Sequence, residues 1–181
     1  FAQAVAAYLP ERVLSLTLIN PLAPFGSGLT EAKPPWAGAG DWLLRRPPSL
    51  ALNAFGALNL LRKASPALFE RLQLAGFHPL DRRRLNQSHI LERFTASHDL
   101  AMRQGVQHLL ADLHLYRNPW DFHPSSISCP AHIYVGLKDI QVPPACGKWL
   151  AEVIPGATLH TFPDEAHYLA HVHAELILRN L

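Results

Sequence analysis

The sequence has little that would tie it to a membrane, a disulfide framework or a nucleic acid. Only two of its 181 residues are cysteines, Cys129 and Cys146, too few for a disulfide framework and without a CxxC zinc pattern. No apolar run approaches the roughly 18 residues that a membrane span requires. The formal net charge is only +2, with scattered basic residues, which does not favour nucleic acid as a partner. We therefore expect two reduced thiols in a cytoplasmic protein without a membrane span.

The chain also lacks an initiator methionine. It begins Phe1-Ala2-Gln3, already inside a helical pattern of apolar residues. We expect these residues to be part of a longer protein.

Hydrophobic patterning places helices and strands in alternation at both ends of the chain. A helical pattern up to Leu9 is followed at 13–19 by a continuous apolar run that suits a buried strand, and Asn20-Pro21 ends it. Further along, we expect a strand, a helix, a strand and a helix at 131–135, 143–153, 157–162 and 170–181. Strands that alternate with helices predict a parallel α/β sheet.

Between these parts, residues 27–124 favour helices. Paired prolines at 34–35 and 47–48 separate helical stretches, and Ser65-Pro66 and Ser88 are typical helix starts. Gly76 fits a helix stop, and Gly105 fits a break between two helices. We therefore expect a helical insertion between two strands of the sheet.

Two loops carry the residue types of an acid–base pair. G-L-K-D at 136–139 follows one expected strand, and P-D-E-A-H at 163–167 follows the next. Reactive groups collect at the carboxyl ends of parallel strands. Asp139 and His167 are 28 residues apart, which is enough for one helix and one strand to return the chain to the same edge. A carboxylate beside a histidine can fix the tautomer of the ring and stabilise the imidazolium.

The order of these motifs resembles the α/β-hydrolase superfamily over essentially the whole chain. G-x-x-D-x-x-V-P at 136–143, I-P-G-A at 154–157 and P-x-x-x-H at 163–167 are similar to its C-terminal signature. The first 21 residues are similar to the helix and strand that follow its nucleophile elbow, and N-P-W-D-F at 118–122 resembles the return from cap to core.

The resemblance implies an α/β fold, namely the C-terminal part of a mostly parallel α/β-hydrolase sheet with an inserted all-helical cap. Residues 1–26 would belong to the core, 27–124 to the helical cap or lid, and 125–181 to the core again. The resemblance also implies a serine-type hydrolase for an ester or a similar small acyl substrate. Asp139 would be its catalytic acid and His167 its general base. We expect neither a cofactor nor a metal.

The nucleophile motif of this superfamily, G-x-S-x-G or its equivalent with Asp or Cys, does not occur in the sequence. The nearest string, Gly26-Ser27-Gly28, precedes proline-rich sequence, and we reject Ser27 as the nucleophile. The resemblance therefore implies that the nucleophile and the oxyanion-hole donors lie upstream of Phe1. We expect the N-terminal half of the same protein as a partner, with a homodimer as the alternative, and an inactive fragment in isolation.

Two alternative functions remain open. An Asp nucleophile in the upstream half would give an epoxide or haloalkane hydrolase that uses the same acid and histidine. The second alternative is a non-catalytic, hydrolase-like binding module. Such a module has no need to retain both Asp139 and His167, which argues against it.

Other residues near these motifs receive ordinary roles. His167, His171 and His173 would form a metal site only with further ligands, and the pattern fixes none. Asp164 and Glu165 are expected to be solvated.

The remaining histidines and aromatic residues are expected to pack. His132 and His160 fall inside expected strands. Five aromatic residues are candidates for an apolar substrate pocket under the cap, although packing between helices is the commoner role for each: Trp36, Trp42, Phe55, Phe69 and Phe77.

Overall fold

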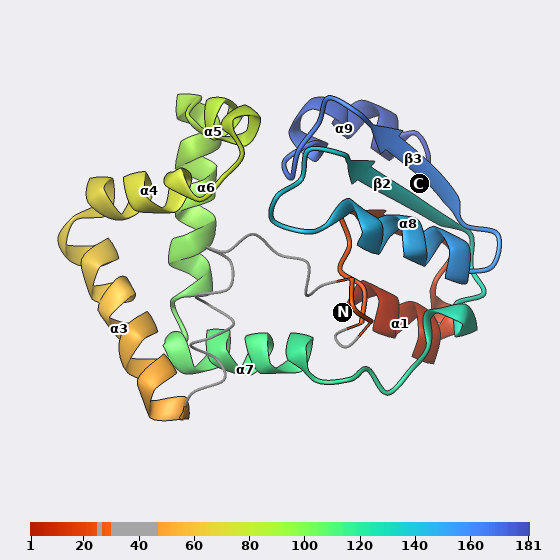
Figure 1. The fold of residues 1–181 in the computed structure, drawn as a ribbon, viewed down its shortest axis with the longest axis horizontal. Coiled ribbons are helices and arrows are strands. Elements are labelled where there is room, and N and C mark those ends of the chain that lie inside the picture. The colour runs from red at the N-terminus through yellow and green to blue at the C-terminus, as the bar shows by residue number, and fades with distance from the viewer. Residues whose placement is uncertain (25–26, 30–46) are drawn as a thin grey trace. The chain divides into compact units, whose positions relative to one another are not determined.

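The computed structural model of this chain describes residues 1–24, 27–29 and 47–181. The chain divides into two compact units, one of Phe1–Lys33 with Pro119–Leu181 and the other of Pro34–Asn118. The first unit is α/β, and the described part of the second is helical (Figure 1). The second unit overlaps the expected cap at 27–124, and its role as a cap stays a prediction.

The first unit contains the expected parallel sheet. Its strands β1 (Leu16–Ile19), β2 (Ala131–Gly136) and β3 (Thr158–Phe162) lie in the order β1-β2-β3, and both neighbouring pairs are parallel. Because all three strands run the same way, their carboxyl ends meet at one edge of the sheet.

The first strand is shorter than the apolar run at 13–19 predicts. Residues 10–12 form the 3₁₀ helix η1 (Pro10–Arg12), and β1 begins only at Leu16. Leu16 pairs with Ala131, the first residue of β2, and its N–H donates to the carbonyl of Pro130. The pairing of β1 with β2 therefore begins directly after Pro130. Proline has no N–H to donate, so it cannot extend the pairing toward the N-terminus with a hydrogen bond of its own.

Helices cover both faces of this sheet (Figure 1). One face carries a buried cluster that contains the strand residues Leu18, Ile133 and Val135. Two helices pack into this cluster, α1 (Ala2–Tyr8) through Ala6 and α8 (Pro144–Val153) through Leu150. On the other face, Tyr134 packs with Leu169 and with Ile177 of α9 (Ala170–Leu178). The alternation along β2 follows the period of two that a strand buried on both faces requires.

The described part of the second unit is a series of short helices, whose starts often coincide with prolines. A proline at the first position lacks an N–H that would be unbonded there anyway. The helices are α3 (Pro48–Ala64), α4 (Pro66–Ala75), α5 (Pro79–Leu85), α6 (Ser88–Ala101) and α7 (Val106–Arg117). A second 3₁₀ helix, η2 (Pro124–Ser126), precedes β2 in the first unit.

Two predicted boundaries in this unit have different outcomes. Gly105 separates α6 from α7 with a φ of 96°, a conformation that favours glycine. The cap predicted at Ser88 is wrong by one residue, because Gln87 takes the extended cap conformation and Ser88 is the first helical residue. The turn between α5 and α6 needs only Asn86 and Gln87, so the helix begins immediately after them.

Among the residues that the structure describes, no helix combines the length and apolar character needed to cross a bilayer.

Candidate active site

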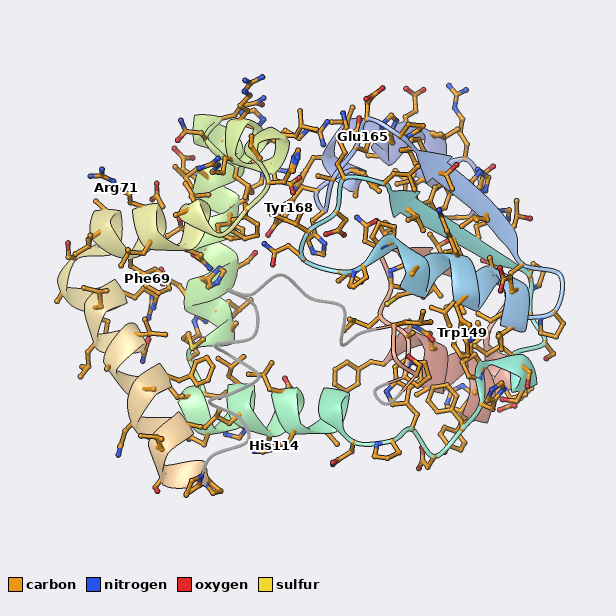
Figure 2. The ribbon with its side chains drawn as sticks, viewed as in Figure 1. Phe69, Arg71, His114, Trp149, Glu165 and Tyr168 are labelled. Carbon is orange, nitrogen blue, oxygen red and sulfur yellow. The ribbon has the colours of Figure 1, made fainter. Side chains whose placement is uncertain are left out.

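The candidate site is formed by the segments that leave the carboxyl ends of the three strands. Asn20 follows β1, the loop 137–143 follows β2, and the loop 163–169 follows β3. The two loops are the segments in which the sequence predicts the acid–base pair. Figure 2 shows Glu165 and Tyr168 on the last of them, between β3 and α9.

Asp139 has a fully buried side chain with a partner on each carboxylate oxygen. Its Oδ1 accepts hydrogen bonds from the backbone N–H groups of Gln141 (2.7 Å) and Val142 (3.0 Å). Its Oδ2 lies 2.8 Å from Nδ1 of His167. The backbone N–H of Asp139 donates to the carbonyl of Gly136, which closes the turn after β2. Both oxygens of this carboxylate are therefore held in fixed directions.

His167 faces Asp139 through Nδ1, and its side chain is 30% exposed. The 2.8 Å distance lies within the range of about 2.6–3.2 Å expected for such a pair. If Nδ1 donates to the carboxylate, Nε2 is the nitrogen that can exchange a proton with a reacting group. The structure thus brings the two predicted residues together, and their catalytic roles stay a prediction.

The loops that carry this pair are pressed against each other. The N–H of Lys138 donates to the carbonyl of Glu165 (2.8 Å), and the N–H of Leu137 donates to that of Phe162 (3.0 Å). A Cβ atom on Gly136 would lie only 2.5 Å from the carbonyl oxygen of Ala166. Glycine is therefore required for this close approach.

Sequence reasoning missed one residue of this arrangement, Asn20. The sequence marks it only as the end of a strand, yet its buried amide bonds to the backbone of the loop 163–169 and to that of Gly136, the last residue of β2. A polar residue directly after an apolar strand and before a proline is the signal that sequence inspection could have followed.

The two acidic neighbours of His167 differ from each other. Asp164 is exposed as expected, and the Lys138 ammonium that bonds to it at 2.7 Å lowers the pKa of its carboxyl. The expectation that Glu165 is solvated is wrong. Its side chain is only 13% exposed, and its Oε1 lies 3.0 Å from Nε2 of His173 on α9. The turn after β3 points this side chain back toward the helix.

The three histidines of the alternative metal site have separate surroundings. His167 bonds to Asp139, His173 bonds to Glu165, and the ring of His171 stacks on Tyr168 with centroids 5.8 Å apart. Within the described residues, no three His, Cys, Asp or Glu side chains gather where they could hold a metal ion.

His132 and His160 pack against each other on neighbouring strands. Nδ1 of His132 lies 3.3 Å from Nε2 of His160, and the ring of Tyr134 stacks on His160 with centroids 4.5 Å apart. Burial, and then the nearby His132, lower the pKa of His160.

The other candidate residues, the rejected nucleophile and the aromatic residues of the expected substrate pocket, are distant in sequence from Asp139 and His167. Trp36 and Trp42 are outside the described residues. Ser27 is exposed, and its hydroxyl accepts a hydrogen bond from the N–H of Leu29. Phe55 packs against the small core of the helical unit, and Phe77 makes an edge contact with Phe94.

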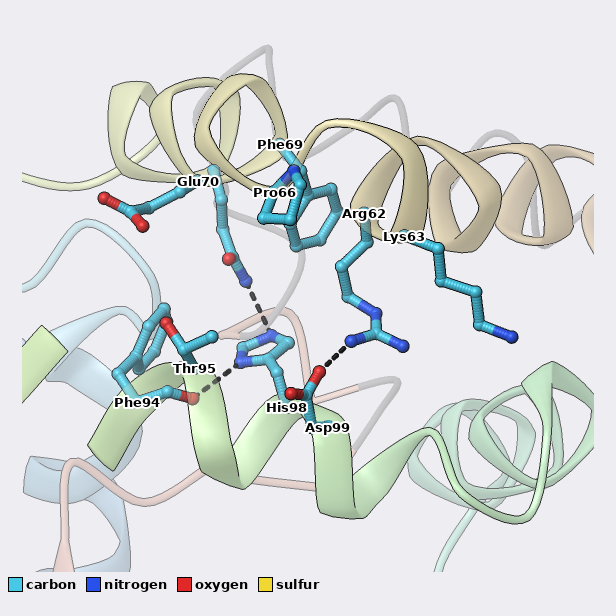
Figure 3. A pocket seen from close by; sticks show the side chains of 10 residues that line it. Arg62, Lys63, Pro66, Phe69, Glu70, Phe94, Thr95, His98 and Asp99 are labelled. Carbon is cyan, nitrogen blue, oxygen red and sulfur yellow. Dashed lines mark hydrogen bonds and ion pairs between the residues drawn. The ribbon is translucent and has the colours of Figure 1, made fainter. Parts of the chain in front are cut away.

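Phe69, the last of the five aromatic candidates, lines a pocket of about 220 Å³ in the helical unit (Figure 3). Pro66 and Phe94 extend its apolar wall, and an ion pair between Arg62 and Asp99 also lines it. The pocket lies among α3, α4 and α6 and has a mixed apolar and polar lining.

Known proteins match this chain in two ways: a curated protein matches a short segment at higher identity, and solved structures match nearly the whole chain at low identity. No family model matches the sequence. Over 47 residues, 25% of this chain, it is 43% identical to a pimeloyl-acyl-carrier-protein methyl ester esterase from Chromobacterium violaceum, and the matched segment spans 18% of that protein.

Two solved structures match almost the full length of the chain. A hydrolase from Pseudomonas aeruginosa PA01 is 19% identical with a TM-score of 0.62, and the match covers 97% of this chain and 56% of that one. An alpha/beta hydrolase enzyme from a Medee basin deep-sea metagenome library is 16% identical with a TM-score of 0.58, over 98% and 59% of the two chains. This chain therefore spans little more than half the length of these proteins, and the likeness concerns the fold.

Proposed function

Since this chain has the α/β-hydrolase fold that its motifs predicted, we propose that the whole protein hydrolyses a carboxylic ester. One observation carries the proposal. A fully buried carboxylate, Asp139, bonds at 2.8 Å to His167, and both lie at the carboxyl ends of adjacent parallel strands. This is the orienting half of a nucleophile–histidine–acid triad.

In the proposed reaction, a hydroxyl nucleophile outside these 181 residues attacks the acyl carbon of the ester. Nε2 of His167 takes the proton of that hydroxyl and gives it to the departing alkoxide, so an alcohol leaves and an acyl-enzyme forms. A water molecule then attacks the acyl-enzyme by the same proton route and releases the acid. Asp139 holds the imidazole in the required tautomer and balances its charge while it is protonated.

The substrate we favour is a methyl or other small alkyl ester of an acyl chain. The local identity to a methyl ester esterase supports this choice. We also propose that the helical unit is the cap, because it is inserted in the chain between β1 and β2.

The full-length protein tests this proposal with p-nitrophenyl butyrate and with a methyl ester of pimelate. We expect His167→Ala to lower kcat by about 10³-fold or more, because the members of a triad act as a unit. The matched control is His171→Ala, which removes a histidine of the same segment that stacks on Tyr168 and should retain turnover within about twofold.

Two outcomes would contradict the proposal. Turnover that survives His167→Ala but is lost in His171→Ala or with a chelator would replace the triad by a metal site. A wild-type protein that hydrolyses no ester, epoxide or haloalkane would favour the non-catalytic binding module.

A further inference from the structure

Asn20 is a buried amide at the carboxyl end of β1, where the loops of the candidate pair meet. Only 7% of the residue is exposed, and its φ is 44°, in the left-handed region that asparagine tolerates better than most residues. Its backbone N–H donates to the carbonyl of Tyr134 at 2.8 Å, which continues the pairing with β2. The position of the Asn20 backbone is therefore set by the sheet itself.

The side chain of Asn20 bonds both to the loop after β3 and to the last residue of β2. Its Nδ2 donates to the carbonyl of His167 at 2.8 Å and to the carbonyl of Ala166 at 3.2 Å. Its Oδ1 accepts the N–H of Gly136 at 2.9 Å. The two carbonyls need a donor and the N–H needs an acceptor, so only one orientation of the amide satisfies all three groups.

These bonds act on the residues that set the geometry of the pair. One is made to the main chain of His167 itself, and another to Gly136, where the chain leaves β2 for Asp139. The carbonyl of Gly136 also accepts the N–H of Asp139 at 3.1 Å. Asn20 therefore bonds directly to the backbone of His167 and reaches that of Asp139 through Gly136.

We propose that Asn20 is a positioning residue for the Asp139–His167 pair, acting through the backbone of the loop 163–169 and of Gly136 at the end of β2. The inference rests on the proposed ester hydrolysis, because Asn20 can affect turnover only if the pair moves a proton. Asn20 does not touch the reacting atoms. Without its amide, the loops keep their direct contacts but lose three hydrogen bonds to the end of β1, and small misplacements of catalytic groups are costly.

The test compares two asparagine variants in the full-length protein. Asn20→Gly removes the amide and leaves a residue that accepts the positive φ, so backbone strain does not confuse the result. The matched control is Asn180→Gly, which removes an amide that bonds to the Tyr134 hydroxyl at 2.8 Å in the same unit. If Asn20→Gly fails to fold, Asn20→Asp takes its place, since it keeps the acceptor for Gly136 and loses both donors.

We expect Asn20→Gly to lower kcat for p-nitrophenyl butyrate by about 10–100-fold, with KM changed less than about threefold. Asn180→Gly should leave kcat within about twofold, even where its melting temperature falls as far as that of Asn20→Gly. The low-field NMR resonance of the His167 Nδ1 proton, which reports its bond to Asp139, should weaken only in the Asn20 variant. Equal losses of kcat in both variants, or an unchanged resonance in Asn20→Gly, would overturn the proposal.

Assays of the wild type and of His167→Ala distinguish a failure of this inference from a failure of the proposed function. If the wild type does not hydrolyse esters, the proposed function fails, and the NMR resonance still decides whether Asn20 positions the pair. If the wild type is active and His167→Ala is not, the kcat of Asn20→Gly decides it.

Discussion

The Asp139 carboxylate has different partners on its two oxygens, backbone N–H groups on one and His167 on the other. An amide at this position has only one acceptor oxygen. In Asp139→Asn, that oxygen either accepts the backbone N–H groups or faces His167, and in the first case the imidazole is driven to the wrong tautomer. We expect kcat for ester hydrolysis by the full-length protein to fall by about 10³-fold or more.

The matched control for this variant is Asp164→Asn on the neighbouring loop. Asp164 is exposed and bonds to Lys138 at the surface, so its loss should change kcat less than about twofold. Steady-state kinetics of both variants check the prediction. Similar effects in the two variants would remove Asp139 from the triad.

Single residues differ in how far the sequence predicts them. The contact between Asp139 and His167 could be predicted because both residues follow neighbouring parallel strands. Asn20 was missed because it bonds to main-chain groups that every sequence contains, and only its place between an apolar strand and a proline marks it. Glu165 was placed wrongly because its partner, His173, lies on a different element, and the local sequence gives no sign of the turn that joins them.

At the scale of elements, hydrophobic patterning located the strands and helices of the α/β unit. It predicted the first and last residues of these elements less accurately than their presence. The apolar run at 13–19 overestimates β1, since the length of a strand depends on where its neighbour begins. Ser88 was one residue from the cap of α6, because the preceding turn, rather than the capping preference of serine, sets the first helical residue. The first error comes from a neighbouring strand that is distant in sequence, and the second comes from a turn that lies outside the helix.

The edge strand β3 carries a pH dependence through His160. Burial and His132 lower the pKa of His160, so the folded state favours the neutral ring. The resulting stability is fully present above the unfolded pKa of about 6.5 and is lost as pH falls from there toward the lower folded pKa. We expect the wild type to lose more unfolding free energy between pH 7 and pH 5 than His160→Gln.

Urea unfolding at a series of pH values measures this difference. The control is His108→Gln, an exposed histidine on α7, which should follow the wild type across the series. A His160→Gln variant with the same pH dependence as the wild type would contradict the prediction.

At the scale of the whole molecule, the outer edge of β1 has no partner strand among the described residues, where β1 pairs only with β2. Large apolar side chains are exposed in the same segment, including Leu14 (92%), Phe1 (70%) and Tyr8 (53%). Open strand edges beside apolar surface promote association. We expect residues 1–181, expressed alone, to self-associate or aggregate, and the full-length protein to remain dispersed.

Size-exclusion chromatography with light scattering checks this expectation. A monodisperse, well-folded monomer of 20.1 kDa would contradict it. In the Leu14→Lys variant, association of the isolated chain should decrease if apolar contact drives it, because this side chain is almost fully exposed.

The separation of the chain into two units has a consequence for how such a protein can diversify. The hydrogen bonds described around Asp139 and His167 come from residues outside 34–118, including those of Asn20. The helical unit is inserted between β1 and β2, ahead of both loops in the chain. Its length and composition can therefore drift, or be exchanged for those of another insert, without removing any of these hydrogen-bond partners. The Asp139–His167 pair and the helical insert are encoded by different stretches of one gene, so each can change separately.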